Sequence, residues 1–246
     1  MKKPFLIAVA ALLAAGCTRQ AGPVPRAAGA QAHAARGGGK AVARKEDPPM
    51  IQEKRSGEWT PGLSEQEQKT LFAIGEDTLA WCVNRTGKPF SFEKYTLTDK
   101  LKTERATFVT LKTADGRLRG CIGSLAPEAE LYKSVHDNAV NAALRDHRFR
   151  PVSPAELPRL VVHISILSPI TPIPSLDKFK LGEHGIILVA QSRRAVYLPE
   201  VAPEQGWTRE ETLTSLSRKA GLPGTAWKRN ARFLVFSSVV LSKHSP

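Results

Sequence analysis

The sequence lacks the short motifs that mark several common enzyme classes. It contains no G-x-G-x-x-G, no Walker loop, no H-E-x-x-H and no G-x-S-x-G. These patterns place phosphate-binding glycines, zinc ligands or a nucleophilic serine. Their absence disfavours the common nucleotide-binding and hydrolase classes, and we expect no cofactor.

Cysteine is also scarce, with only Cys17, Cys82 and Cys121 in 246 residues. The three residues form no C-x-x-C pair and cannot build a disulfide framework, so no metal site is expected. Cys82 lies on the apolar stripe of a predicted helix, where a buried and inert thiol is the default. A disulfide between Cys82 and Cys121 is an open alternative for an oxidising compartment.

Acidic residues are few compared with basic ones. The chain has 36 Lys and Arg against 23 Asp and Glu, a net charge of +13. Residues 1–59 carry ten of the basic residues and four of the acidic ones, which is +6 and leaves +7 for the rest. No basic run is interleaved with aromatic residues, so nucleic acid is not the expected partner. Solubility and attraction to an anionic membrane surface account for the charge.

The N-terminus has the features of a bacterial lipoprotein signal. Two lysines precede an apolar run over residues 5–15 that is too short to span a bilayer. Ala14-Ala15-Gly16-Cys17 resembles a lipobox, although Ala14 stands where leucine is commoner. We expect a lipid on Cys17 to anchor the protein in the cell envelope. Thr18, in place of an aspartate, predicts the outer membrane, facing the periplasm. An ordinary signal peptide with a chance cysteine is the alternative.

Composition then divides the chain into three segments. After the signal peptide of residues 1–16, residues 17–58 are rich in Ala, Gly, Pro, Arg and Lys. Such a segment buries too little apolar surface to offset the entropy of ordering, and we interpret it as a disordered tether. Residues 59–246 form the predicted folded domain.

Helix and strand signals alternate within this domain. Capping boxes at Ser64–Glu67 and Thr208–Glu211 begin two predicted helices, and residues 128–145 form another. Hairpins are predicted over 107–124 and 186–199, with further strands over 160–167 and 232–241. The fold class is therefore α+β, with a mixed, largely antiparallel sheet and about three main helices.

The central motif is Leu118-Arg119-Gly120-Cys121-Ile122-Gly123, the second strand of the first hairpin. Alternation along a strand puts Leu118, Gly120 and Ile122 on one face. It puts Arg119, Cys121 and Gly123 on the other. We expect the first face to be core and the second to carry any chemistry.

One hypothesis is a thiol-dependent enzyme with Cys121 as the nucleophile. Arg119 on the same face would favour the thiolate. His184, or alternatively His147, would act as the base, oriented by Asp146 or Glu183. In the structural alternative, Cys121 is a small buried side chain and Arg119 pairs with Asp146. A zinc site built from Cys121, His147 and His184 is a further alternative that we do not expect.

The favoured hypothesis is a ligand- or partner-binding module that uses the face of this motif. The two glycines would let a ligand approach the backbone closely. The predicted binding residues are Arg119, Gly120, Gly123, Arg145, Asp146 and Arg148.

Several separated motifs between about residues 64 and 242 resemble those of the AMMECR domain family. They are Leu118–Gly123, Arg145–Phe149, Ile164–Ser168, His184-Gly185 and Tyr197–Trp207. The resemblance implies a mixed α/β domain with a larger and a smaller lobe, with the R-G-C-I-G motif close to their junction. The family's activity is unsettled.

Bacterial and archaeal members of this family resemble protein A of the AmmeMemoRadiSam system. The resemblance implies Memo-like or radical SAM proteins as partners. Family members are mostly intracellular and unlipidated, so the lipobox and the tether are departures of this chain. A radical SAM partner needs a reducing compartment, which conflicts with export.

Overall fold

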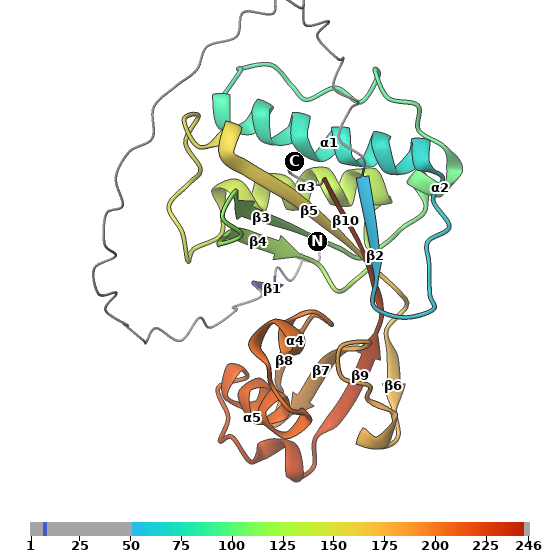
Figure 1. The fold of residues 1–246 in the computed structure, drawn as a ribbon, viewed down its shortest axis with the longest axis vertical. Coiled ribbons are helices and arrows are strands. Elements are labelled where there is room, and N and C mark those ends of the chain that lie inside the picture. The colour runs from blue at the N-terminus through green and yellow to red at the C-terminus, as the bar shows by residue number, and fades with distance from the viewer. Residues whose placement is uncertain (1–6, 9–50, 244–246) are drawn as a thin grey trace, which may run out of the picture. The chain divides into compact units, whose positions relative to one another are not determined.

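The fold was analysed in a computed structural model, which describes residues 7–8 and 51–243 (Figure 1). Most of the predicted signal peptide, the lipidation site Cys17 and residues 18–50 of the predicted tether lie outside the described residues.

The described residues form five α-helices and ten strands. The helices are α1 (Glu65–Asn84), α2 (Asp99–Lys102), α3 (Leu131–Leu144), α4 (Val201–Gln205) and α5 (Arg209–Lys219). The strands are β1 (Ile7–Ala8), β2 (Ile51–Arg55), β3 (Thr107–Thr113), β4 (Leu118–Gly123), β5 (Leu160–Leu167), β6 (Thr171–Ile173), β7 (Gly185–Ala190), β8 (Arg193–Tyr197), β9 (Arg232–Phe236) and β10 (Ser238–Lys243).

The strands form two sheets in which every neighbouring pair is antiparallel. A six-stranded sheet has the order β1-β4-β3-β5-β10-β2, and a four-stranded sheet has the order β6-β9-β7-β8. Helices α1 and α3 pack together on one face of the first sheet, whereas α5 lies against β8 of the second (Figure 1). This arrangement confirms the α+β fold class. Among the helices described, none is long and apolar enough to cross a membrane.

Both predicted capping boxes are present. The Ser64 hydroxyl accepts a hydrogen bond from the Glu67 N–H at 3.3 Å, and the Glu67 carboxylate accepts one from the Ser64 N–H at 2.7 Å. Thr208 and Glu211 repeat this exchange at the start of α5. Each box satisfies backbone donors that the first helical turn leaves unpaired, so the sequence located these helix starts correctly.

The final predicted strand, residues 232–241, is two strands that belong to different sheets. β9 pairs with β6 and β7, whereas β10 pairs with β5 and β2. Between them, the Ser237 N–H donates to the Ser168 hydroxyl and its C=O accepts from the Ser168 N–H, both at 2.9 Å. The prediction of one strand was wrong because an unbroken apolar pattern does not reveal a change of sheet.

The predicted tether also extends too far along the chain. Residues 51–55, which we assigned to it, form β2 and pair along β10 from Val239 to Lys243. Ile51 packs against the core of the six-stranded sheet. Four of the five β2 residues are polar or charged, and three of these are exposed, which is a weak strand pattern that the pairing with β10 stabilises.

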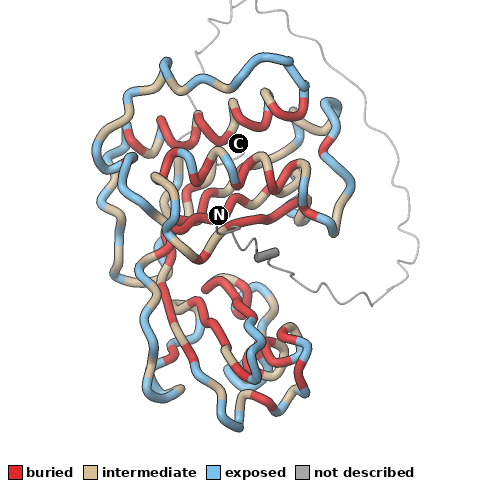
Figure 2. The backbone as a smooth tube through the Cα atoms, turned by 180° about the vertical axis from the view of Figure 1, so that it is seen from behind, coloured by how far each residue is buried: buried red, intermediate tan, exposed pale blue. Residues whose placement is uncertain are grey.

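Each sheet has its own hydrophobic cluster. The six-stranded sheet packs on α1 and α3 through a cluster that includes Leu71, Val135 and Ile164. The second cluster joins the four-stranded sheet and α5 with residues of β3 and β4, including Phe108 and Cys121. Figure 2 shows the buried residues concentrated along the strands and on the inward sides of the helices. β4 contributes to both clusters, with Ile122 in the first and Cys121 in the second.

We predict that a chain beginning at Trp59 is less stable than one beginning at Pro49, because it lacks β2. The loss of several strand hydrogen bonds, at about 1 kcal/mol each, would lower the free energy of unfolding by on the order of 2 kcal/mol or more. Thermal unfolding should show a Tm lower by about 5 °C or more. Equal Tm values for the two chains would contradict this role of β2.

Candidate functional site

The R-G-C-I-G motif lies on β4, as predicted, but its register has an irregularity. Leu111 of β3 pairs with Gly120, whereas the next residue, Lys112, pairs with Leu118. Arg119 is therefore the extra residue of a β-bulge, which breaks the simple alternation of faces. Leu118 packs against the cluster that contains Cys121, so the predicted grouping of Leu118 with Ile122 was wrong.

Both faces of β4 are core. Cys121 is 5% exposed and packs in the cluster of the four-stranded sheet. Ile122 is 2% exposed and packs in the cluster of α1 and α3. The face expected to carry chemistry is buried because a second sheet packs against it, a contact that the local pattern does not contain.

The two glycines of the motif are required by packing. A Cβ atom at Gly120 would overlap the carbonyl oxygen of Ala142 in α3. A Cβ atom at Gly123 would overlap the Phe108 ring and the carbonyl oxygen of Thr107. Both glycines let other segments of the protein approach the strand closely. This favours a role in packing for Gly120 and Gly123 over contact with a ligand.

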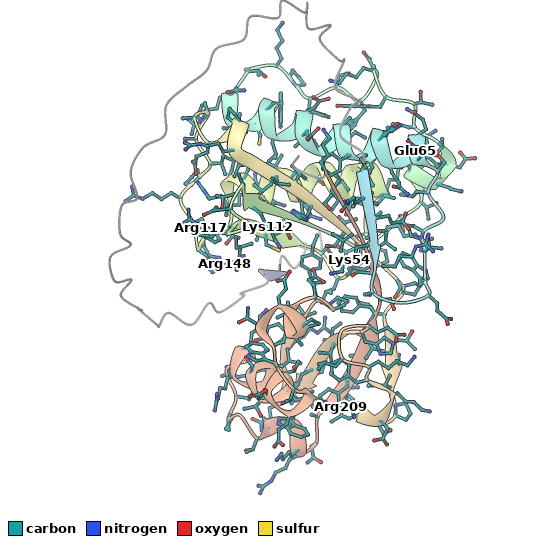
Figure 3. All side chains as sticks on the ribbon, viewed as in Figure 1. Lys54, Glu65, Lys112, Arg117, Arg148 and Arg209 are labelled. Carbon is teal, nitrogen blue, oxygen red and sulfur yellow. The ribbon has the colours of Figure 1, made fainter. Side chains whose placement is uncertain are left out.

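Asp146 and Arg148 hold the backbone of Cys121. The Asp146 carboxylate accepts a hydrogen bond from the Cys121 N–H at 2.9 Å, and the Arg148 guanidinium donates to the Cys121 C=O at 3.2 Å. Arg148 also donates to both carboxylate oxygens of Asp146, at 2.9 and 2.7 Å. Figure 3 labels Arg148 next to the strand that Figure 1 labels β4. We call this unit the Asp146–Arg148 clamp.

The charge of Asp146 depends on the clamp. Burial by itself would raise the pKa of this carboxyl, but the hydrogen bonds from Arg148 and from the Cys121 N–H lower it below its usual range. Asp146 is only 4% exposed. The carboxylate therefore stays ionised in a buried position, and its role is to fix the loop after α3 onto β4.

Arg119 has a different partner from the one expected. Its guanidinium donates to the two carboxylate oxygens of Glu156 at 2.7 and 3.2 Å. Hydrogen bonds from Arg119 and then from Ser153 lower the pKa of Glu156 to about 2. The predicted pair of Arg119 with Asp146 does not form. The Phe149 ring lies near both guanidiniums, with its centroid 5.9 Å from Arg119 Cζ and 5.3 Å from Arg148 Cζ.

The thiol of Cys121 is not activated by its surroundings. The Thr110 hydroxyl donates to Cys121 Sγ at 3.2 Å. Burial nevertheless raises the pKa of Cys121 to about 11, and burial raises the pKa of Cys82 to about 11 as well. Both cysteines are unpaired, so the alternative disulfide between them is not formed.

His184 is not brought to Cys121. It lies before β7 of the four-stranded sheet, where its Nδ1 accepts a hydrogen bond from the Lys180 N–H at 3.3 Å and its Nε2 is 3.8 Å from Glu183. No hydrogen bond between His184 and Cys121 occurs in the described part of the chain. Residues 51–243 likewise contain no group of three His, Cys, Asp or Glu side chains that could hold a metal ion.

Arg145 is exposed, and so are two further residues of the same loop. Residues 145–150, which we call the basic loop, expose Arg145, His147 and Arg150, whereas Asp146 is buried. Arg145 Nη1 donates to Asn141 Oδ1 at 3.1 Å. Arg119 and Arg148 are paired with carboxylates, but no ion pair of Arg145 or Arg150 occurs in the part of the chain that the structure describes.

Sequence reasoning missed Lys219, the last residue of α5. Its Nζ donates to the Val196 C=O at 2.9 Å and lies 4.6 Å from the centroid of the Tyr197 ring. Burial lowers the pKa of Lys219 to about 7; a thiolate at Cys121 would raise this pKa, and the positive charge of Arg148 lowers it. A lysine in the last turn of a helix is normally solvated and favoured by the helix dipole, so the sequence carried no signal for this site.

We predict that Gly120→Ala lowers the free energy of unfolding by about 2–4 kcal/mol, because α3 must move away from β4 to relieve the overlap. Gly75→Ala is the matched control. Its Cβ would have no neighbour nearer than 3.5 Å, and alanine favours the helix, so we expect no loss of stability. Urea unfolding of the two variants checks this, and equal midpoints would contradict it.

Comparison with known proteins places this fold in a family. The sequence model of the AMMECR1 family matches residues 76–241. A Thermotoga maritima protein is 40% identical over 140 residues, which are 56% of this chain and 79% of that protein. An uncharacterized Arabidopsis thaliana protein is 37% identical over 150 residues, 56% of this chain and 70% of that protein.

The fold agrees with a solved structure as well. The crystal structure of an uncharacterized protein from Pyrococcus horikoshii superposes with a TM-score of 0.69 at 28% identity, covering 76% of this chain and 96% of that one. The family match covers more than half of the chain, including β3, β4, the clamp and the four-stranded sheet, whereas β1 and β2 lie outside it. The chain therefore belongs to the AMMECR1 family.

Proposed function

We propose that this chain is a partner-binding module, tethered to the cell envelope by a lipid on Cys17, and that the basic loop contacts the partner. The observation that carries the proposal is the Asp146–Arg148 clamp. It fixes a loop of exposed cationic residues to the backbone of the R-G-C-I-G strand.

The clamp holds the basic loop in one position before a partner binds. Asp146 and Arg148 alternate in sequence with residues that reach solvent, so the buried pair orders its exposed neighbours. A loop that is already ordered loses less conformational entropy when a partner binds. The strand and the clamp thus act as positioning elements, and the exposed side chains are available for contact.

The chemistry of the partner follows from the charge of the loop. Arg145 and Arg150 are exposed and His147 lies between them. Guanidiniums without an ion pair among the described residues favour carboxylates, with which arginine forms bidentate hydrogen bonds. We therefore propose a protein partner with an acidic surface.

The family resemblance supplies a specific partner to test. The N-terminal signal features support a location outside the cytoplasm, whereas a radical SAM protein requires a reducing compartment. A Memo-like protein of the AmmeMemoRadiSam system, acting without the radical SAM protein, is the partner we propose.

We predict that Arg145→Glu with Arg150→Glu weakens binding of the Memo-like protein from the same organism at least about tenfold, because two attractive contacts become repulsive. The measurement is biolayer interferometry with residues 49–246 immobilised. Arg117→Glu, at an exposed arginine of the β3–β4 turn, is the matched control and should leave binding unchanged. Undiminished binding of the double variant would contradict the role of the loop.

The second function is a thiol-dependent enzyme with Cys121 as the nucleophile. Lys219 favours it, because an amine with a pKa of about 7 can accept a proton at neutral pH. Against it stands the burial of the thiol. With a pKa of about 11, on the order of one Cys121 side chain in several thousand is a thiolate at pH 7.4.

We predict that neither Cys82 nor Cys121 reacts with iodoacetamide in the folded protein at pH 7.4 on the timescale that labels glutathione completely. Both should react after unfolding in urea, when burial no longer raises the pKa. Intact mass with Cys82→Ala and Cys121→Ala variants assigns each adduct. Native labelling of Cys121 at least about tenfold faster than Cys82 would reverse the order of the two functions.

A further inference from the structure

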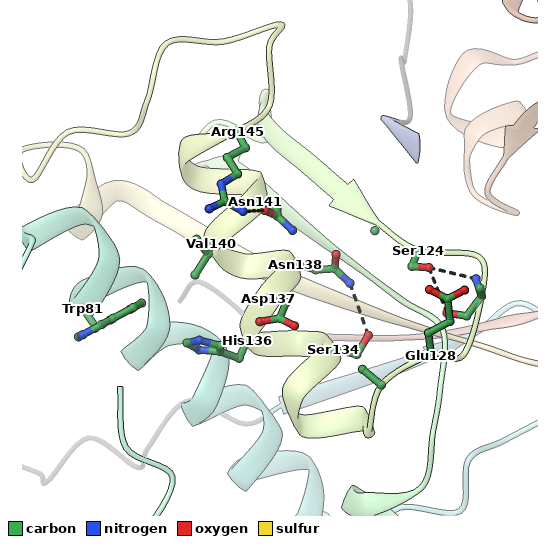
Figure 4. A pocket seen from close by; sticks show the side chains of 13 residues that line it. Trp81, Ser124, Glu128, Ser134, His136, Asp137, Asn138, Val140, Asn141 and Arg145 are labelled. Carbon is green, nitrogen blue, oxygen red and sulfur yellow. Dashed lines mark hydrogen bonds between the residues drawn. The ribbon is translucent and has the colours of Figure 1, made fainter. Parts of the chain in front are cut away.

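A groove of about 540 Å³ lies over α3, and Arg145, the first residue of the basic loop, is among the residues that line it (Figure 4). It is lined by the segment that follows β4, by one side of α3 and by Trp81 of α1. In Figure 4, Ser134 and Asn138 point toward the segment with Ser124 and Glu128, while Trp81 and His136 lie at the opposite end. Its volume is in the range of small-molecule binding sites.

Asn138 supplies an unpaired acceptor to this groove. The residue is 6% exposed. Its Nδ2 donates to the Thr107 C=O at 3.2 Å and to the Thr107 hydroxyl at 3.0 Å. Because a carbonyl oxygen can only accept, these bonds fix the orientation of the amide. Asn138 Oδ1 is left without a donor among the described residues.

Asn141, one helical turn further along, supplies an unpaired donor. It is 7% exposed, and its Oδ1 accepts from Arg145 at 3.1 Å. Because a guanidinium can only donate, the Asn141 amide is also fixed in orientation. Its Nδ2 has no acceptor in residues 51–243. Residues three apart on a helix are neighbours, so the groove holds a free acceptor and a free donor side by side.

The charged residues around the groove favour neither an anionic nor a cationic ligand. Glu128, Asp137 and Arg145 bring both signs to its lining. Burial lowers the pKa of His136, whose Nδ1 is paired with the Thr78 hydroxyl at 2.8 Å, so the imidazole is neutral at pH 7. The ring of His136 lies 5.6 Å from that of Trp81, and together they form an aromatic surface at one end.

We infer that this groove binds a neutral, hydroxyl-rich ligand of the sugar class. A hydroxyl group both donates and accepts, so neighbouring hydroxyls on one sugar ring can pair with Asn138 Oδ1 and Asn141 Nδ2 together. The C–H face of a sugar can pack on the indole of Trp81. An aliphatic ligand would bury both amides without partners, which costs free energy.

The test uses three trisaccharides, namely maltotriose, cellotriose and N-acetylated chitotriose, added to residues 49–246 in isothermal titration calorimetry. At about 10 mM sugar, a site with a Kd of about 1 mM would be nearly saturated. We expect at least one of them to bind. Asn141→Leu and Trp81→Leu should each weaken that binding at least about tenfold, the effect of one lost hydrogen bond or packing surface.

Gln66→Leu and Trp59→Leu are matched controls, at an exposed amide of α1 and at a partly buried tryptophan, neither of which lines the groove. They should bind as the wild type does, and thermal unfolding verifies that all variants fold. Absence of binding for all three sugars, or binding that survives both groove variants, would overturn the inference. Co-sedimentation with purified peptidoglycan, repeated with Asn141→Leu, then distinguishes a cell-wall glycan from a free oligosaccharide as the natural source.

Discussion

The hydrogen bonds between the Asp146–Arg148 clamp and the backbone of Cys121 are the interaction on which the rest of this region depends. An unpaired N–H and C=O on a buried strand would cost several kcal/mol. Among the described residues, β1 pairs with Ile122 and Gly123 but not with Cys121. A carboxylate and a guanidinium supply one acceptor and one donor instead. The same contacts order the loop that follows α3.

Because β4 is buried between α3 and the four-stranded sheet, the glycines and the cysteine of its motif serve packing rather than chemistry. Gly120 and Gly123 are small because α3 and β3 approach them, and Cys121 fills space between the two sheets. A thiol in such a position has its neutral form favoured by burial, whatever charges stand nearby. The parts of the region that reach solvent are the basic loop and the groove over α3, which share Arg145.

The two exposed features have different chemistry and call for different ligands. The basic loop presents cationic groups without carboxylate partners in the described chain, which suits an acidic protein surface. The groove has mixed charge and two oriented amides with one free group each, which suits hydroxyl groups. Lys219 belongs to neither feature, although the charge of Arg148 acts on it. Its lowered pKa arises chiefly from burial of the amine, which donates to the Val196 C=O of β8.

The sequence by itself determined most of the longer elements, since capping boxes, turn residues and hydrophobic period are local signals, but it did not predict α2, α4, β2 or β6. It located the starts of α1 and α5, the β3–β4 hairpin and β5, and its motifs carried the family resemblance. It could not show that β2 joins β10, that residues 232–241 divide between two sheets, or that Arg119 is a bulge residue. Tertiary structure alone decided which face of β4 is buried and which partners Arg119, Arg148 and Lys219 have. The burial of Cys121 and the pairing of its backbone depend on segments far along the chain, such as Asp146, 25 residues away, and Phe236, 115 residues away, and no local pattern encodes such contacts.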